Sequence, residues 1–201
     1  MTFSENVLSK YLGKRIFLDS NLLLLLLIGR FQRERIETFK RTSTFTRADF
    51  DNLVALTRQF SKVATTPHVL TEVNGMANSL PEYVKDAWSL SFAAAIRDLL
   101  EIFDPATEII DHECFRLFGL TDAAIKQAGS EMLILTQDSR LAAYLRAGDS
   151  IASLSKRYSP PTKASRVSFF IIAALKPAAS TPQTLSESTP PPSDGCKPSA
   201  S

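Results

Sequence analysis

The sequence contains little cysteine and little histidine. Its 201 residues include two cysteines, Cys114 and Cys196, and two histidines, His68 and His112. Two thiols do not make a disulfide framework, and two histidines cannot build a zinc site of common spacing. We therefore expect a reducing, cytoplasmic location, with Cys114 as a buried and inert core thiol.

The sequence also lacks a long apolar run. The run 22–28 is bounded by Asp19, Ser20 and Asn21 on one side and by Arg30 on the other. It is far shorter than the roughly 20 residues that span a bilayer, and no small-residue cleavage site follows it. We expect neither a membrane helix nor a signal peptide here. A helix buried on all faces, capped by Ser20 or Asn21, is the expected structure.

A strong excess of charge of either sign is absent as well. The formal net charge is +2, with 44% hydrophobic and 22% charged residues, which is ordinary for a globular protein. The total charge therefore indicates no strong preference for a polyanion. The length fits one domain and a tail. We expect a domain over 1–158, an apolar extension over 159–175 and a disordered Pro/Ser/Thr-rich tail over 176–201.

Short apolar segments alternate with helical patterns along the chain. Strands are expected at 15–18, 61–66, 107–110, 132–136 and 150–155. Helices are expected over the leucine run and at 49–60, 67–78, 81–103, 112–118, 122–128 and 139–146. This alternation predicts an α/β domain with a mostly parallel sheet. The apolar segment 166–175 fits either a strand or a helix.

Four acidic residues lie just past or near hydrophobic segments: Asp19, Glu72, Asp122 and Asp138. Asp19 and Asp138 directly follow predicted strands, and Glu72 lies about a turn into the helix after the second strand. Ligands of parallel sheets bind beyond the carboxyl ends of the strands, so this placement favours convergence. Clustered carboxylates repel one another unless protons or cations intervene, and magnesium or manganese prefers oxygen ligands.

Each acidic residue also has a purely structural interpretation. Asp138 precedes a helix and could be its N-cap, as could Thr121 with Asp122 in the first turn. Glu72 alone could be a surface glutamate. Asp19 has leucine-rich surroundings that predict burial, and an unpaired buried carboxylate is costly, which favours a bound metal there. The joint occurrence of the four favours the metal-site interpretation.

The order of these segments resembles the PIN-domain family of metal-dependent nucleases, over roughly Lys14 to Tyr158. The resemblance rests on residues 17–21 (FLDSN), Glu72 after 65–67 (TTP), 120–125 (LTDAAI) and 133–138 (LILTQD). It implies a three-layer α/β/α sandwich with a mostly parallel sheet of about five strands, binding Mg²⁺ or Mn²⁺. By matched position, Asp19, Glu72, Asp122 and Asp138 correspond to the catalytic, metal-binding quartet, and Asn21 and Thr136 to supporting polar positions.

The resemblance implies a metal-dependent endoribonuclease that hydrolyses phosphodiester bonds of single-stranded RNA. The toxin half of a toxin–antitoxin pair, with a protein inhibitor as partner, is a further expectation, as is a homodimer. The alternative is a non-catalytic RNA-binding or scaffold protein that keeps the fold. A phosphatase of the haloacid dehalogenase type ranks lower, because it needs a second acid where this chain has Asn21.

A basic stretch from Arg30 to Arg47 has phenylalanines interleaved with its cations. Its candidate substrate-binding residues are Arg30, Arg33, Lys40 and Arg41. They could guide a phosphate backbone while the phenylalanines stack on bases. The interpretation that we favour is an amphipathic helix with a solvated face. We also expect His68 to be a helix-start residue rather than a ligand, and Trp88 to be a core residue.

Overall fold

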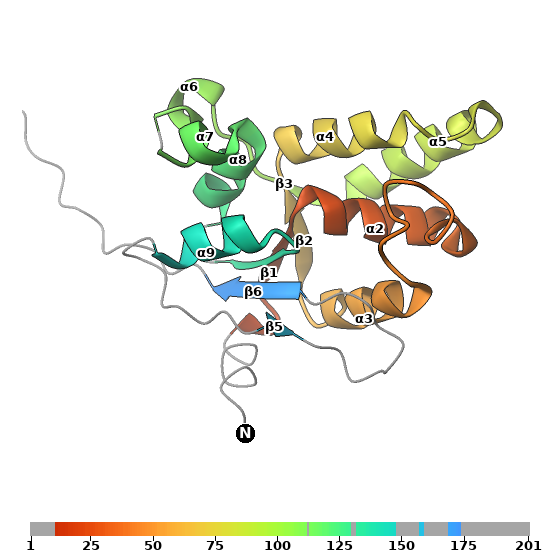
Figure 1. The fold of residues 1–201 in the computed structure, drawn as a ribbon, viewed down its shortest axis with the longest axis horizontal. Coiled ribbons are helices and arrows are strands. Elements are labelled where there is room, and N and C mark those ends of the chain that lie inside the picture. The colour runs from red at the N-terminus through yellow and green to blue at the C-terminus, as the bar shows by residue number, and fades with distance from the viewer. Residues whose placement is uncertain (1–10, 112, 130–131, 148–156, 159–168, 174–201) are drawn as a thin grey trace, which may run out of the picture.

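The computed structural model describes residues 11–111, 113–129, 132–147, 157–158 and 169–173 (Figure 1). These residues form a six-stranded sheet in the order β3-β2-β1-β4-β6-β5. The strands are β1 (Arg15–Leu18), β2 (Lys62–Thr65), β3 (Leu100–Glu101), β4 (Leu133–Thr136), β5 (Arg157–Tyr158) and β6 (Phe169–Ala173). The first four are parallel to one another, and β6 pairs antiparallel with both β4 and β5.

Helices lie between the strands along the chain and cover the sheet (Figure 1). They are α2 (Ser20–Phe31), the 3₁₀ helix η1 (Arg33–Arg35), α3 (Arg47–Thr57), α4 (Pro67–Ala77), α5 (Glu82–Asp98), α6 (Ala106–Ile109), α7 (Glu113–Phe118), α8 (Leu120–Ala128) and α9 (Ser139–Ala147). The expected α/β class, a three-layer sandwich with a mostly parallel sheet, is confirmed. The described sheet has six strands where about five were expected.

The core is built around β1 and the leucine-rich helix that follows it. Ile16, Phe17 and Leu18 of β1 are fully buried, because β1 is an inner strand with neighbours on both sides. In α2, every residue from Leu22 to Gly29 is buried, as expected for a helix that is apolar on all faces. α2 packs against α3, α4 and α5, so the leucine run joins three helices to the sheet. No helix among the described residues is long and apolar enough to span a membrane.

The strand order creates a topological switch point between β1 and β4. The chain runs outward from β1 through β2 to β3 and then returns to the other side of β1 to form β4. Leu18 and Leu135 are register partners, so the carboxyl ends of β1 and β4 lie side by side. Such a point is where open parallel sheets bind ligands.

The prediction of a strand at 107–110 is wrong. Residues Ala106–Ile109 form the short helix α6, which begins directly after Pro105, a residue whose fixed φ suits the start of a helix. The strand β3 lies earlier, at Leu100–Glu101, where it pairs with Ala64 and Thr65 of β2. The helix expected to reach about Phe103 therefore ends at Asp98.

The apolar segment near the carboxyl end contributes a strand. Residues Phe169–Ala173 form β6, whose register places Ile171 opposite Leu135 of β4. The sheet thus includes part of the segment expected as an extension over 159–175. The strand predicted at 150–155 and the tail 176–201 lie outside the described residues.

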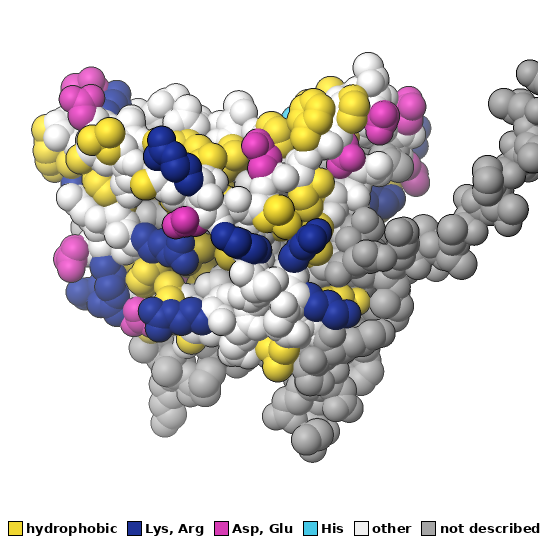
Figure 2. Space-filling view, turned by 180° about the vertical axis from the view of Figure 1, so that it is seen from behind, with side chains coloured by type: hydrophobic (Ala, Val, Ile, Leu, Met, Phe, Trp, Pro, Cys, Tyr) yellow, Lys and Arg dark blue, Asp and Glu magenta, His cyan; other side chains and the backbone are white. Residues whose placement is uncertain are grey.

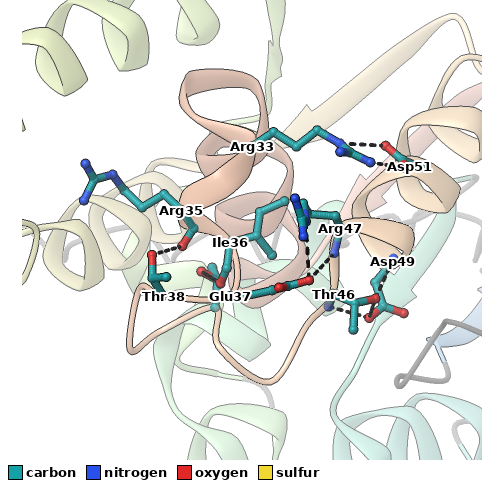
Figure 3. Close-up of polar contacts among 10 residues, drawn as sticks. Arg33, Arg35, Ile36, Glu37, Thr38, Thr46, Arg47, Asp49 and Asp51 are labelled. Atoms are coloured by element: carbon teal, nitrogen blue, oxygen red, sulfur yellow. Dashed lines mark hydrogen bonds and ion pairs between the residues drawn. The ribbon is translucent and has the colours of Figure 1, made fainter.

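The basic stretch is not an amphipathic helix. After η1 the chain passes through turns up to Thr46, where a capping box with Asp49 starts α3 (Figure 3). Buried Phe39 and Phe45 anchor this segment to the core, so neither ring is available to stack on a base. The helical prediction fails because hydrophobic burial and turn hydrogen bonds hold the segment in another conformation. Thr42, for example, is buried and donates from Oγ1 to the Ile36 carbonyl at 2.8 Å.

Candidate functional site

Asp19 lies at the switch point, directly after β1. Its backbone N–H donates to the Leu135 carbonyl at 3.0 Å, which extends the pairing of β1 with β4 by one residue. Its side chain caps α2, with Oδ1 accepting from the Leu22 N–H at 2.8 Å. The expectation that Ser20 or Asn21 caps this helix is therefore wrong, because the helix begins at Ser20 and the carboxylate of Asp19 reaches its first free N–H groups.

The second carboxylate oxygen of Asp19 is held from β4. Oδ2 accepts from Thr136 Oγ1 at 2.6 Å and from the Gln137 N–H at 2.8 Å. Asp19 is only 5% exposed, and burial raises the pKa of its carboxyl above the ordinary value, although these hydrogen bonds favour the charged form. Thr136, expected as a supporting polar residue, is in direct contact with the Asp19 carboxylate.

Asp138 is joined to Asp19 through the same threonine. The Asp138 N–H donates to Thr136 Oγ1 at 2.9 Å. The Asp138 side chain is exposed, and its Oδ1 accepts from the N–H groups of Arg140 at 2.7 Å and Leu141 at 3.1 Å, so Asp138 does cap α9. Both bonds use one oxygen, which leaves Oδ2 able to bind a ligand at the same time.

Glu72 reaches the site from α4. Its Oε2 accepts from Ser20 Oγ at 2.7 Å, a contact between residues 52 positions apart. Ser20 is the hydroxyl residue that the sequence reasoning treated only as a possible cap, and its place beside Asp19 was the available signal. Asn21, expected in a supporting role, is exposed on the first turn of α2, and no hydrogen bond joins it to the four acids in the described part of the chain.

Asp122 shows that the four carboxylates share one region. It lies in the first turn of α8 and is partly buried. Burial, followed by repulsion from Asp138, Glu72 and Asp19, raises the pKa of Asp122 to about 7 from an ordinary 3.8. Repulsion from Asp138 also contributes to the raised pKa of Asp19. Side chains from β1, α4, α8 and β4 thus converge at one end of the sheet.

The four carboxylates do not lie close enough together to form a complete set of metal ligands in this structure. Among the described residues, no group of three acidic, histidine or cysteine side chains has the compact geometry of a metal site. The donor chemistry nevertheless fits a hard divalent cation, because the converging groups offer only oxygen atoms. The electrostatics fit too, since burial and then the negative charge of the other three acids raise the pKa of Asp122, and a cation would balance that charge.

A cluster of cationic and aromatic side chains adjoins the acids. This cluster was not predicted from the sequence. Lys126 Nζ donates to the Tyr144 hydroxyl at 3.0 Å and lies 4.7 Å from the centroid of that ring. The Arg140 guanidinium lies 5.6 Å from the centroid of Phe118. Lys126 is one helical turn from Asp122 and Arg140 is two residues from Asp138, and this spacing was the signal in the sequence.

A shallow hollow of about 400 Å³ lies beside Glu72. It lies between α4 and α8, and its wall is made by Pro67, His68, Thr71, Glu72, Leu120 and Thr121. His68 is in the first turn of α4, as expected for a helix-start residue. Its Nδ1 is buried without a hydrogen-bond partner among the described groups.

The basic residues expected to bind substrate lie in the last turn of α2 and in the segment that follows it. Arg30 is at the far end of α2, about 16 Å from Asp19 for eleven residues at about 1.5 Å each. Arg33 forms an ion pair with Asp51 of α3 (Figure 3). Lys40 and Arg41 are exposed in the turns that follow η1. The length of α2 therefore separates Arg30 from the carboxylate site.

No family model, no curated protein and no solved structure matches this chain. The fold and the site define it as an α/β protein with four carboxylates converging at the switch point of a mostly parallel sheet.

Proposed function

We propose that this protein is a metal-dependent endoribonuclease that hydrolyses phosphodiester bonds of single-stranded RNA. The observation that carries the proposal is the convergence of acids at the switch point, where Thr136 contacts both Asp19 and Asp138 and Ser20, next to Asp19, donates to Glu72. Four carboxylates at a switch point are suited to divalent cations and to phosphate chemistry. The resemblance to PIN-domain nucleases supplies the substrate class, and it places the same four residues in the catalytic role.

The four acids have distinct parts in this proposal. Asp138 and Asp19 would hold Mg²⁺ or Mn²⁺ directly, while Glu72 and Asp122 would bind it directly or through water. A bound cation would supply a hydroxide near neutral pH and would neutralise charge on the scissile phosphate. The chain itself fixes the positions: Thr136 and Gln137 orient the Asp19 carboxylate, and Ser20 orients Glu72.

The state of Asp122 links the site to pH. With a pKa of about 7, this carboxyl keeps its proton through mildly acidic conditions when no cation is bound. A cation binds the ionised form, so binding would release that proton. We therefore expect manganese affinity and RNA cleavage to rise together between about pH 6 and about pH 8.

The decisive test separates metal binding from helix capping at Asp138. Asparagine caps helices about as well as aspartate, so Asp138→Asn preserves the capping role while it removes the negative charge. We expect this variant to fold with a melting temperature no lower than that of the wild type, because repulsion among the acids is relieved, and to lose at least about a hundredfold in cleavage of a single-stranded RNA with Mn²⁺. The matched control is Asp86→Asn, at an exposed position of α5, which should cleave normally. Full activity in Asp138→Asn would reject the proposed site.

One observation favours a second function, a non-catalytic RNA-binding or scaffold protein. Both oxygens of Asp19 already accept hydrogen bonds, and the described acids do not form a compact ligand set. Such a protein would bind RNA equally well with EDTA or Mn²⁺ and would never shorten it. The toxin role rests on the resemblance alone. It is tested by expressing the chain and Asp138→Asn in a bacterium, where only the wild type should arrest growth.

A further inference from the structure

Two adjoining hollows lie at the end of α2 that is remote from the acids. The walls of the larger, about 430 Å³, include Arg30, Arg33, Phe50, Asp51, Val54 and Arg58. The walls of the smaller, about 240 Å³, include Arg30, Arg58, Phe60, Ser61, Lys62 and Asp98. Arg30 and Arg58 belong to both walls. We call the two hollows together the Arg30–Arg58 surface.

Close packing of α2 against α3 brings these two arginines together. A Cβ at Gly29 would lie 2.3 Å from the ring of Phe50, so only glycine allows α3 to approach α2 this closely. Arg30 follows Gly29 directly, and Arg58 is the C-cap residue of α3. The surface is therefore built on the end of α2, on α3 and on the turn that follows α3.

The charge of this surface is only partly compensated. Arg33 is paired with Asp51, and Lys62 Nζ donates to the Asp98 carbonyl at 3.1 Å. Arg30 and Arg58 are exposed, and neither has an ion-pair partner among the described residues. Lys and Arg side chains also gather in a band across the face of the molecule seen in Figure 2. Both guanidinium groups are thus exposed on the walls of the same two hollows.

We propose that Arg30 and Arg58 bind a backbone phosphate of single-stranded RNA. A guanidinium offers paired N–H donors that match phosphate oxygens, and two such groups can hold one phosphate from both sides. The larger hollow is within the usual size range of ligand sites, and Phe50 and Val54 give it an apolar wall that suits a ribose or a base. The identity of the ligand rests on the proposed function, whereas the place of the site does not.

The separation of the two sites gives the inference a length requirement. Arg30 is about 16 Å from Asp19 along α2. At about 3.4 Å per phosphate of a helical strand, about five stacked nucleotides reach from one site to the other. A three-nucleotide RNA can therefore occupy only one of the two sites, whereas a ten-nucleotide RNA is long enough to contact both.

The experiment measures binding of fluorescein-labelled three- and ten-nucleotide RNAs by anisotropy in EDTA, where no cleavage occurs. We expect Arg58→Ala and Arg30→Ala each to weaken binding of the ten-nucleotide RNA by about tenfold. Each should also lower the slope of log affinity against log salt by about 0.7, the value for one phosphate on a single strand. Arg58→Lys, which keeps the charge but not the paired donors, should lie in between.

The matched control is Arg47→Ala, at the other end of α3, where Glu37 already compensates the charge at 3.6 Å. Unchanged affinity and salt slope in a folded Arg58→Ala variant would overturn the inference. It would equally be overturned if millimolar inorganic phosphate displaced the RNA completely, because the site would then serve a small phosphate ligand. Dependence on Arg58 without any cleavage by the wild type would uphold the RNA surface and reject the nuclease function.

Discussion

At the scale of single residues, the hydroxyl of Thr136 connects the two acids that flank the switch point. It donates to Asp19 Oδ2 at 2.6 Å and accepts from the Asp138 N–H at 2.9 Å. The residue is fully buried, so neither bond can be replaced by solvent without rearrangement. One oxygen atom thus joins the Asp19 carboxylate to the backbone of Asp138.

Replacement of Thr136 by valine should disturb both stability and activity. Valine keeps the shape of threonine but removes the hydroxyl, which leaves a buried carboxylate oxygen and an N–H with fewer partners. We expect a loss of about 1–3 kcal/mol in the free energy of unfolding, measured by urea denaturation, and at least about a tenfold loss in RNA cleavage. Thr136→Ser should retain most of both. A valine variant as stable and active as the wild type would show that the hydroxyl does not position the acids.

The raised pKa of Asp122 predicts how stability depends on pH without divalent cations. The folded state holds its proton up to about pH 7, whereas the unfolded chain loses it near the ordinary value of 3.8. The folded state therefore binds more protons in this window, and the contribution of Asp122 to stability falls as pH rises from about 4 to about 7. Thermal melting in EDTA should show Asp122→Asn gaining stability relative to the wild type across this window. A constant difference between the two proteins would contradict the raised pKa of Asp122.

Cys114 should be chemically inert in the folded protein. Its side chain is fully buried, and burial raises the pKa of the thiol to about 11, so almost no reactive thiolate is present at neutral pH. In a Cys196→Ser background, a thiol reagent at pH 8 should label Cys114 only as fast as the protein unfolds. Labelling within seconds under native conditions would show that the thiol is accessible.

At the scale of elements, glycines in two helices have opposite consequences. Gly29 lies where α2 meets Phe50 of α3, and an added Cβ would come within 2.3 Å of that ring. Gly75 lies in α4 with no heavy atom within 4 Å of the corresponding position. The first glycine is required by packing, and the second is not.

Alanine substitutions at these two glycines should therefore change the free energy of unfolding in opposite directions. Gly29→Ala forces α2 and α3 apart, and we expect it to cost about 1–3 kcal/mol of unfolding free energy. Gly75→Ala reduces the entropy lost by the backbone in a helix and should gain about 0.5–1 kcal/mol. Guanidinium denaturation of both variants gives the comparison. Equal effects would mean that the α2–α3 contact is looser than the structure shows.

The same scale shows where sequence patterns suffice and where they do not. The strands around Asp19 and Asp138 were predictable, because each is a short apolar run that ends at an acid. The segment 107–110 has β-type residues too, yet it forms α6 after Pro105, while the strand that pairs with β2 is Leu100–Glu101. Which of two such segments becomes a strand depends on which one pairs with a neighbouring strand. A single sequence does not show that pairing.

At the scale of the whole molecule, the order of strands brings distant acids to one place. Asp19 and Asp138 follow adjacent parallel strands, and this could be predicted from the rule that ligands bind at switch points. The contacts that support the acids could not be predicted in the same way. Ser20 contacts Glu72 and Asn21 does not, and this depends on the direction of each side chain in the folded protein. The basic stretch was also misjudged, because buried phenylalanines and not its charges determine its path.

The central claim is that the four carboxylates jointly hold a divalent cation. The most direct measurement is isothermal titration of Mn²⁺ into the metal-free protein at pH 7.5, with the wild type, Asp138→Asn and the control Asp86→Asn side by side. The account predicts saturable binding by the wild type and by Asp86→Asn, with at least a tenfold weaker affinity in Asp138→Asn. Absence of binding by the wild type, or equal affinity in all three proteins, would contradict it.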